Sequence, residues 1–389
     1  MTEAHGNPQP PFRTHVCLVS GEAAANLLPV LDPAFRPREA VLIESPQMRQ
    51  HGKWLGEAMS ANGIARVRHV PIKDAYDITG IERELEEFLG REPEHTAIAL
   101  NVTGGTKPLA IAAQQVFSRS GIAVFYLERE RSEVSFIGGG APKRVLKARL
   151  KLEDYFLAHG HTVARLERAR PPVADVELAR ELVKEISSLG KAIPLLNMCA
   201  SSAEQKPGFC SDSLKPGQRS PHFERLVMLL ETAGHVKWEG TDRLRFKDEE
   251  ARAFANGGWL DFYVHDEFLA LQQRNRAGDG ARNVRVVQAD GTRNELDLAL
   301  FARNRLHVVE CKTRGFTSKA ASDEARKALF QLDSLSSLGG LNTRALFVSY
   351  LPLNETILQR AKGMRIRTVV GPDLGKLSSE MEKWTAQPY

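Results

Sequence analysis

Two carboxylates and one amine in the last third of the chain have the types and spacing of a catalytic group. Asp297 precedes one apolar run, and Glu310 and Lys312 end the next, with the polar segment 303–305 between the runs. This pattern predicts two antiparallel strands joined by a tight turn, which would hold Asp297 beside Glu310 and place Lys312 on the same face as Glu310. Converging carboxylates bind a hard divalent cation, and an amine beside that cation can orient a water or neutralise charge on a phosphate. The hairpin therefore predicts a metal-dependent phosphodiester hydrolase.

A purely structural interpretation of the same hairpin is a pair of strands with exposed, salt-bridged charges, which is common in antiparallel sheets. Glu310 and Lys312 follow the apolar segment 306–309, however, and charged groups beside a buried strand require a partner or a function. Glu295 shares the predicted face of Asp297 and could be a further metal ligand or an exposed charge. His307, inside the second strand, is expected to be structural.

A glycine turn in the first third of the chain is the second chemical pattern. The sequence Asn-Val-Thr-Gly-Gly-Thr-Lys-Pro at 101–108 follows an apolar run and opens a helical pattern. Paired glycines let the backbone approach a ligand, and a helix N-terminus favours anions. The spacing differs from that of a P-loop, G-x-x-x-x-G-K-[ST]. The turn predicts an anion site at the carboxyl edge of a parallel sheet, with a plain connecting turn as the alternative.

The elements that must position this turn alternate between strands and helices. Strands are expected at 15–20, 40–43, 65–72, 96–100 and 122–127, and helices at 48–61, 80–89 and 106–118. This alternation predicts a parallel sheet covered on both faces, followed by a returning hairpin strand at 134–137. We expect this first α/β domain to occupy residues 1–145.

The rest of the chain predicts a connector and a second α/β domain. Residues 146–221 combine helical patterns with a Ser-, Gly- and Pro-rich stretch from 199, which predicts a helical connector and a loop. Residues 222–389 mix strands and helices and predict a domain with a mixed sheet. Its strands are expected at 236–238, 244–246, 283–289, 295–301, 305–312, 345–349 and 367–370, and its helices at 222–232, 248–255, 319–336 and 354–362.

Composition limits the partners and the location. The chain has 389 residues, of which 42% are hydrophobic and 26% charged, as in ordinary globular proteins. A formal charge of +5 and a pI near 9.0 permit a polyanionic partner. The polar N-terminus has no signal-peptide core and no segment has the apolar length of a membrane span, which predicts a cytoplasmic protein without membrane association. Its four cysteines do not form a disulfide framework.

The glycine turn resembles the N-x-T-G-G-T-K signature of CARF domains, the CRISPR-associated Rossmann-fold sensors, over about residues 12–145. In that family two protomers face each other and bind one cyclic oligoadenylate across the dimer axis. The resemblance implies that the turn and the end of the first strand line the ligand pocket. The residues that it assigns are Ser20, Gly21, Thr103, Gly104, Gly105, Thr106 and Lys107, with Asn26 as a further candidate. A ring of phosphates suits helix N-termini and a lysine from each subunit.

The carboxylate-lysine hairpin resembles the PD-(D/E)XK nuclease superfamily over about residues 222–375. Asp297 stands at the first acidic position, and Glu310-Cys311-Lys312 stands at the E-x-K. With the upstream Gly-Gly-Trp-Leu-Asp, the domain looks like the CARF–nuclease fusions of type III CRISPR systems. The resemblance implies Mg²⁺ or Mn²⁺ held by Asp297, Glu310 and the Cys311 carbonyl. Lys312 would position the attacking water and stabilise the pentavalent transition state.

Two further residues of the second domain gain a role only from this resemblance. Asp261 stands where those fusions usually carry Glu, and is a candidate metal ligand with a shorter reach. Gln331, in the helical pattern after the hairpin, matches a glutamine found downstream in the superfamily, and a solvated helix residue is the alternative.

Together the two resemblances predict a homodimeric, metal-dependent endonuclease with a Rossmann-like sensor and a restriction-endonuclease-like domain. Its expected activator is a cyclic oligoadenylate, most simply cyclic tetra-adenylate. It would cleave single-stranded DNA or RNA, or nick DNA, in antiviral defence. One rival is a ligand-responsive regulator that binds nucleic acid, in which residues 222–246 would form a helix and a wing-like hairpin. The other is a restriction or repair nuclease without an effector, which leaves the glycine turn unexplained.

Overall fold

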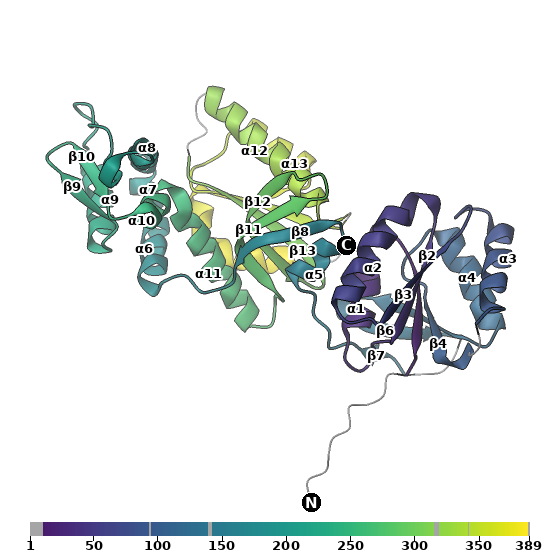
Figure 1. The fold of residues 1–389 in the computed structure, drawn as a ribbon. Coiled ribbons are helices and arrows are strands. Elements are labelled where there is room, and N and C mark those ends of the chain that lie inside the picture. The colour runs from purple at the N-terminus through teal and green to yellow at the C-terminus, as the bar shows by residue number, and fades with distance from the viewer. Residues whose placement is uncertain (1–10, 93–94, 139–141, 315–318, 341, 388–389) are drawn as a thin grey trace, which may run out of the picture.

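The chain forms two α/β domains and a helical region, arranged in an elongated molecule (Figure 1). The structure is a computed structural model that describes residues 11–92, 95–138, 142–314, 319–340 and 342–387. The N-terminal residues 1–10, on which the expected location partly rests, lie outside this range. Within the described residues, none of the helices combines the length and the apolar character needed to cross a membrane.

The N-terminal domain is built on a seven-stranded sheet in the order β3-β2-β1-β4-β5-β6-β7. The strands are β1 Thr14–Leu18, β2 Glu39–Glu44, β3 Arg66–Pro71, β4 Ile98–Asn101, β5 Ala123–Glu128, β6 Glu133–Ile137 and β7 Arg144–Val145. The first five are parallel, and β6 and β7 follow in antiparallel pairing; the sequence predicted the parallel strands and the return of β6, but not β7. Cys17 on β1 is level with Asn101 on β4, so the loops that follow these two strands meet at one edge of the sheet.

Helices cover both faces of this sheet, because alternate strand residues point to opposite sides. They are α1 Ala24–Leu31, α2 Arg49–Ala61, α3 Ile78–Leu89 and α4 Lys107–Arg119. Cys17 packs in one hydrophobic cluster with α1 and α2, whereas Val16 and Leu18 pack in another with α3 and α4. The sequence did not predict α1, since Pro29 lies inside it and nearly all of its residues are buried, which hides the helical period.

The segment predicted as a helical connector contains a strand as well as helices. Its elements are α5 Leu152–Leu157, β8 His161–Glu167, α6 Val173–Lys184, α7 Ile186–Leu189 and α8 Ile193–Ala203. β8 pairs antiparallel with β11 and forms the edge of the second sheet. Its residues are half-buried or exposed, so no apolar alternation marked it as a strand. The expected loop from residue 199 is also wrong for its first residues, which belong to α8.

The C-terminal domain has a mixed six-stranded sheet in the order β15-β14-β13-β12-β11-β8. Its strands are β11 Gly280–Gln288, β12 Arg293–Ala302, β13 Arg305–Lys312, β14 Arg344–Ser349 and β15 Arg367–Val370. The helices and the small hairpin around it are α9 Pro221–Thr232, β9 Val236–Glu239, β10 Arg243–Phe246, α10 Glu249–Ala253, α11 Trp259–Gln273, α12 Lys319–Ser337, α13 Glu355–Gly363 and α14 Leu377–Ala386. Strands β13, β14 and β15, at one side of the sheet, run parallel, and the others pair antiparallel. The mixed sheet was predicted, but α11 and α14 were not. Buried residues surround α11 on several sides and hide its period.

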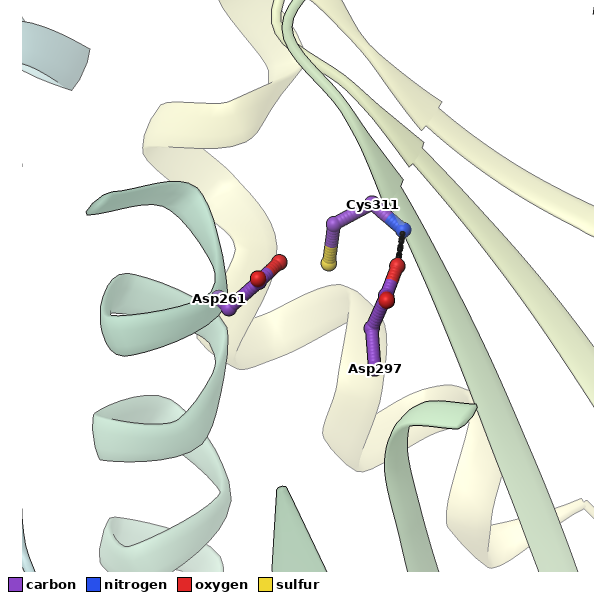
Figure 2. A group of neighbouring side chains, drawn as sticks. All are labelled: Asp261, Asp297 and Cys311. Atoms are coloured by element: carbon purple, nitrogen blue, oxygen red, sulfur yellow. Dashed lines mark hydrogen bonds between the residues drawn. The ribbon is translucent and has the colours of Figure 1, made fainter. Parts of the chain in front are cut away.

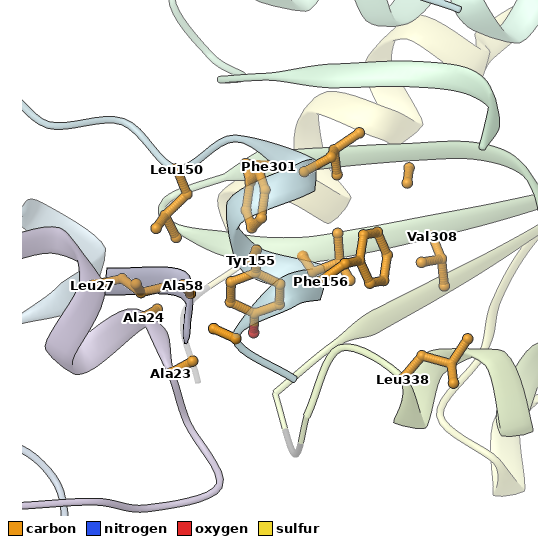
Figure 3. Packing of buried hydrophobic residues seen from close by; sticks show 14 of the residues in the cluster. Ala23, Ala24, Leu27, Ala58, Leu150, Tyr155, Phe156, Phe301, Val308 and Leu338 are labelled. Carbon is orange, nitrogen blue, oxygen red and sulfur yellow. The ribbon is translucent and has the colours of Figure 1, made fainter. Parts of the chain in front are cut away.

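A continuous apolar core joins the two domains. Ala23, Ala24 and Leu27 of the N-terminal domain belong to the same buried cluster as Phe301 and Leu338 of the C-terminal domain. Figure 3 shows Tyr155 and Phe156 of α5 between these two sets of side chains. Because interdomain contact by buried apolar groups resists independent motion, movement of one domain is coupled to the other.

Candidate metal centre and ligand turn

The β12–β13 hairpin positions the acids and the lysine that the sequence singled out. Leu298 pairs with Val309, which places Asp297 next to Glu310 at the open end of the hairpin. The two turn residues, Arg303 and Asn304, have φ angles of 52° and 55°, as a two-residue hairpin turn with the twist of its strands requires. Glu310 is only 5% exposed, and its carboxylate accepts a hydrogen bond from the Lys312 ammonium. The predicted common face of Glu310 and Lys312 is thus present.

Three potential metal donors converge beside this hairpin. The donor atoms of Asp261, Asp297 and Cys311 all lie within 4.8 Å of one another. Figure 2 shows the Asp261 carboxylate reaching from α11 toward the Cys311 thiol and Asp297. One Asp297 oxygen accepts a 2.7 Å hydrogen bond from the Cys311 backbone N–H, which fixes the carboxylate against β13. The Glu310 carboxylate lies outside this 4.8 Å group and is paired with the Lys312 ammonium.

An irregular turn before α11 brings Asp261 to the hairpin. Residues Phe254–Gly258 form a π-helical turn, a feature that often marks functional sites. Gly257 has a φ of 117°, and a Cβ on it would lie 2.5 Å from the Thr313 hydroxyl, so only glycine fits there. Trp259 is fully buried and packs edge-on against Tyr350, which anchors the first turn of α11. Asp261 lies in that first turn and is therefore held facing β13.

Burial and mutual repulsion dominate the electrostatics of the centre. Burial raises the pKa of Asp261 well above its usual range, and the Asp297 charge raises it further. Burial also raises the pKa of Asp297, against the opposing effect of Lys312. Burial and the Asp297 charge raise the pKa of Glu310 to about 7. Burial alone would lower the pKa of Lys312, but Glu310 and Asp297 raise it above its usual range, so this amine stays protonated. Such a set of acids fits a divalent cation, because the cation would relieve their repulsion.

The donors open into a cavity of about 450 Å³ that the sequence outlined only in part. Gln331 on α12 lines it, together with Lys312, so the structure brings this predicted residue to the site. Its other lining residues include Asn256, Thr313, Arg314, Glu324 and Lys327, which sequence reasoning missed. The Asn-Gly-Gly turn was the available signal for Asn256. The α12 residues carried none, since only packing decides which side of a helix meets a site.

Two predicted alternatives are resolved by the geometry. Glu295 is half exposed, and its carboxylate lies 3.3 Å from the Arg285 guanidinium across the strands, as an exposed salt-bridged charge does. His307 is fully buried, its Nδ1 lies 2.9 Å from the Arg305 carbonyl, and its ring packs edge-on against Trp384. Burial lowers the pKa of His307 to about 3, so the ring stays neutral and structural.

The shifted pKa of Glu310 predicts a pH effect on stability. The folded-state pKa, about 7, lies above the usual value of 4.5, so the folded protein keeps a proton that the unfolded chain releases. The free energy of unfolding that Glu310 contributes is therefore fully present below pH 4.5 and is lost as the pH rises to about 7. We expect wild type to lose up to about 3 kcal/mol of unfolding free energy relative to Glu310→Gln across this window.

Urea unfolding in EDTA at pH 5, 6, 7 and 8 measures this difference. Comparing the two proteins at each pH cancels the titration of buried groups that do not interact with Glu310, such as His307. A difference that stays constant with pH, or one that grows in the opposite direction, would show that the Glu310 pKa is not raised.

The glycine turn is shaped by close backbone contact at the end of β1. A Cβ on Gly104 would lie 2.1 Å from the Leu18 carbonyl oxygen, so only glycine can occupy this position. Gly105 has a φ of 77°, which also favours glycine. Thr106 caps α4 by accepting a 3.3 Å hydrogen bond from the Leu109 N–H. The turn is thus held in one conformation at the N-terminus of α4, where the exposed Lys107 begins the helix.

Some residues assigned to the ligand pocket also hold the turn together. The Thr103 hydroxyl donates to Asn101 over 2.6 Å and accepts from the Leu127 N–H over 2.8 Å. Asn26 is fully buried and links the Leu18 carbonyl to the Asn101 side chain. These contacts place Asn26 inside the fold, where it supports the turn. Ser20 and Gly21 are half-buried at the end of β1, next to the turn.

Comparison with known proteins agrees with both halves of this description. Family models match residues 14–155 as a Card1 CARF domain and residues 248–388 as a Card1-like endonuclease domain. Protein VC1899 from Vibrio cholerae is 24% identical, with a TM-score of 0.82 over 96% of this chain and 97% of that one. Can2 from Sulfobacillus thermosulfidooxidans, solved in complex with cyclic tetra-adenylate, is 24% identical, with a TM-score of 0.77 over 96% and 98%.

A type III CRISPR defence DNA nuclease activated by cyclic oligoadenylate has a lower TM-score of 0.53 and is 19% identical, over 91% of this chain and 48% of that one. At these identities the solved structures show a common fold. A comparison with curated protein sequences gave no match.

The fold and the site together define a two-domain sensor–nuclease, in which a Rossmann-like domain with a glycine turn is joined to a restriction-endonuclease-like domain. In particular, the chain belongs to the fusions of a Card1 CARF domain with a Card1-like endonuclease domain. The helix and hairpin that a winged-helix regulator would need do form, as α9, β9 and β10. The endonuclease match and the convergence of Asp261 and Asp297 beside the buried Glu310 nevertheless favour a nuclease over that rival.

Proposed function

We propose that this nuclease is activated by a cyclic oligoadenylate and cleaves nucleic acid in type III CRISPR defence in the cytoplasm. The single observation that carries the proposal is the convergence of Asp261, Asp297 and Cys311 beside the Glu310–Lys312 pair. A regulator would gain nothing from two converging carboxylates on one cavity beside a buried, paired Glu310. The sensor would comprise residues 1–145, the connector 146–221 and the nuclease 222–389, with β8 contributed by the connector.

Asp297 and Asp261 would hold a Mg²⁺ or Mn²⁺ ion with their converging carboxylates, and Glu310, which is paired with Lys312 in this structure, would join them when the ion binds. Burial raises the pKa of the Cys311 thiol well above its usual range, and a neutral thiol is a poor ligand for a hard cation. We therefore assign the Cys311 carbonyl, rather than its sulfur, to the metal. When bound, the ion would supply Lewis-acid stabilisation of the scissile phosphate.

Lys312 would act on the substrate side of this centre. Its ammonium stays protonated and is about a third exposed to the cavity, so it can donate to the attacking water or to a phosphate oxygen. Gln331, Lys327 and Arg314 line the same cavity and would contact the phosphates on either side of the scissile bond. This arrangement suits cleavage of single-stranded DNA or RNA, or of one strand of a DNA duplex, which would nick the duplex.

The glycine turn would bind the activator. Backbone N–H groups at the start of α4 and the exposed Lys107 suit phosphate groups, and the solved complex of Can2 with cyclic tetra-adenylate makes that ring the first ligand to test. Ser20, Gly21 and residues 103–107 would line one half of the pocket. A second protomer would supply the other half, because a symmetric ring matches a two-fold axis.

The test is a cleavage assay with the purified chain, Mn²⁺ or Mg²⁺, and labelled single-stranded DNA, single-stranded RNA or supercoiled plasmid. We expect cyclic tetra-adenylate to raise the cleavage rate at least about tenfold, the size of a typical allosteric coupling. EDTA should abolish cleavage. Cleavage at the same rate with and without the ligand would refute the sensor role, and cleavage in EDTA would refute the metal role.

A further inference from the structure

Glu22 lies where the ligand turn meets the nuclease domain. It follows Ser20 and Gly21 directly, and its backbone N–H lies 3.4 Å from the Ser20 hydroxyl. Its side chain lines a cavity of about 450 Å³ together with Thr103 of the glycine turn, Arg129 after β5, and Asn342 of the nuclease domain. One cavity therefore touches both the predicted activator site and the nuclease.

The Glu22 carboxylate ties three segments together. It lies 2.7 Å from the Arg129 guanidinium and accepts a hydrogen bond from the Asn342 amide. The Tyr155 hydroxyl lies 3.2 Å from the same carboxylate and 2.7 Å from the Gly339 carbonyl oxygen. A hydroxyl has one proton, so Tyr155 donates either to the sensor or to the nuclease at any moment. Glu22 and Arg129 are mostly buried, which strengthens their pairing.

Backbone packing holds the same junction closed. A Cβ on Gly340 would lie 2.9 Å from the Gly21 carbonyl oxygen, and its φ is 78°. The segment after α12 is therefore seated directly on the end of the first-strand loop, where the activator is expected to bind.

Helix α12 connects this junction to the catalytic cavity. Glu324, Lys327 and Gln331 on α12 line the cavity of the metal centre. Leu335 near the end of α12 and Leu338 just after it belong to the interdomain core with Tyr155, and Figure 3 shows Leu338 in this core. From Gln331 to its last residue the helix rises roughly 9 Å. A shift of the junction would therefore move the residues that line the nuclease site, because a packed helix moves as a unit.

We propose that Glu22 is a latch that opposes activation, an inference that rests on the proposed response to a cyclic oligoadenylate. A phosphate arriving beside Ser20 and Thr103 would compete with Glu22 for the Arg129 guanidinium. Without the Arg129 guanidinium the Glu22 carboxylate is no longer held in position beside Asn342, and the segment Gly339–Gly340 that follows α12 can shift. Glu22 is thus a positioning residue, which acts on cleavage through α12.

Linkage makes the proposal quantitative. If the Glu22 contacts hold an inactive state that does not bind the activator, weakening that state raises the active fraction and lowers the apparent Kd by the same factor, as long as the inactive state predominates. For Glu22→Gln we expect cleavage without activator to rise about tenfold and the Kd of cyclic tetra-adenylate to fall by the same factor. Cleavage at saturating activator should stay within about twofold of wild type.

Glu82→Gln is the matched control. Glu82 also pairs with an arginine of the same domain, Arg119, at 3.2 Å, but on α3, away from the nuclease. Rates with Mn²⁺ and labelled single-stranded DNA, and Kd by calorimetry, should match wild type for this variant. Asn342→Ala removes the same contact from the nuclease side and should reproduce the effect of Glu22→Gln. Asn342→Ala also tests the latch if the Glu22→Gln protein does not fold.

An unchanged rate without activator in both Glu22→Gln and Asn342→Ala would overturn the latch, as would a lower rate at saturating activator with intact binding. If wild type does not respond to cyclic tetra-adenylate, the proposed function fails, and hydrogen exchange then decides about the latch separately. Peptides covering α12 and its junction with β14 should exchange faster in Glu22→Gln than in Glu82→Gln, and equal exchange would refute the contact's restraining role.

Discussion

Replacing Lys312 by methionine should lower the rate of metal-dependent cleavage about 10²–10³-fold, the usual effect of removing one preorganised donor from a developing anion. The substitution removes the ammonium that lies between Glu310 and the cavity but keeps the length of the side chain. Metal binding should persist, since Asp261, Asp297 and Glu310 remain. The measurement is single-turnover cleavage of labelled single-stranded DNA at saturating Mn²⁺, with Mn²⁺ affinity determined by calorimetry.

The fold should tolerate this change. Glu310 loses its partner, but its pKa is already raised to about 7, so the carboxyl can take up a proton instead of remaining as an uncompensated charge. Thermal unfolding followed by circular dichroism should confirm this. Lys184→Met is the control, because Lys184 also pairs with a glutamate but is 76% exposed and far from the cavity. Cleavage within tenfold of wild type in a folded Lys312→Met protein would remove Lys312 from the catalytic group.

The second large effect is expected for Gly104→Ala in the glycine turn. Its added Cβ would lie 2.1 Å from the Leu18 carbonyl oxygen, and a backbone atom cannot give way as a side chain can. The turn must move away from β1, which we expect to destabilise the chain by about 1–3 kcal/mol. The N–H groups at the start of α4 would move with it, so activator affinity should fall by at least about tenfold.

Gly363→Ala provides the comparison for this substitution. Gly363 lies at the end of α13 with no atom within 4 Å of a Cβ and no positive φ, so alanine should leave stability unchanged or slightly higher. Mn²⁺ affinity should match wild type in both variants, because neither touches the metal centre. Retained activation in Gly104→Ala would show that the turn is only a connector.

These experiments separate the two halves of the molecule. Lys312→Met affects chemistry while leaving activator binding intact, whereas Gly104→Ala affects activator binding while leaving the metal centre intact. Glu22→Gln differs from both, because it should increase one activity and one affinity together. A single defect that explained all three outcomes, such as misfolding, would lower every measured quantity.

The sequence by itself determined the features that depend on local pattern. Alternating strands and helices predicted the parallel sheet of the first domain, and apolar runs on either side of segment 303–305 predicted the hairpin of Asp297, Glu310 and Lys312. The glycine turn was visible for the same reason. Gly105 has a positive φ, which is a constraint within the turn itself, and Gly104 lies against the backbone of β1. Side-chain period and turn chemistry are local properties, so one sequence suffices to read them.

Only the tertiary structure decided which distant residues meet. Asp261 reaches Asp297 because a π-helical turn and the buried Trp259 aim α11 at the hairpin, and Glu22 meets Asn342 across 320 residues of chain. β8 joins the second sheet although its own residues show no apolar alternation. Such contacts arise from packing of whole elements, whose faces and neighbours no local period specifies. The catalytic hairpin was therefore predictable from local pattern, and Asp261 was a candidate only through the family resemblance, whereas its meeting with Asp297 and the connection to the sensor depended on the fold.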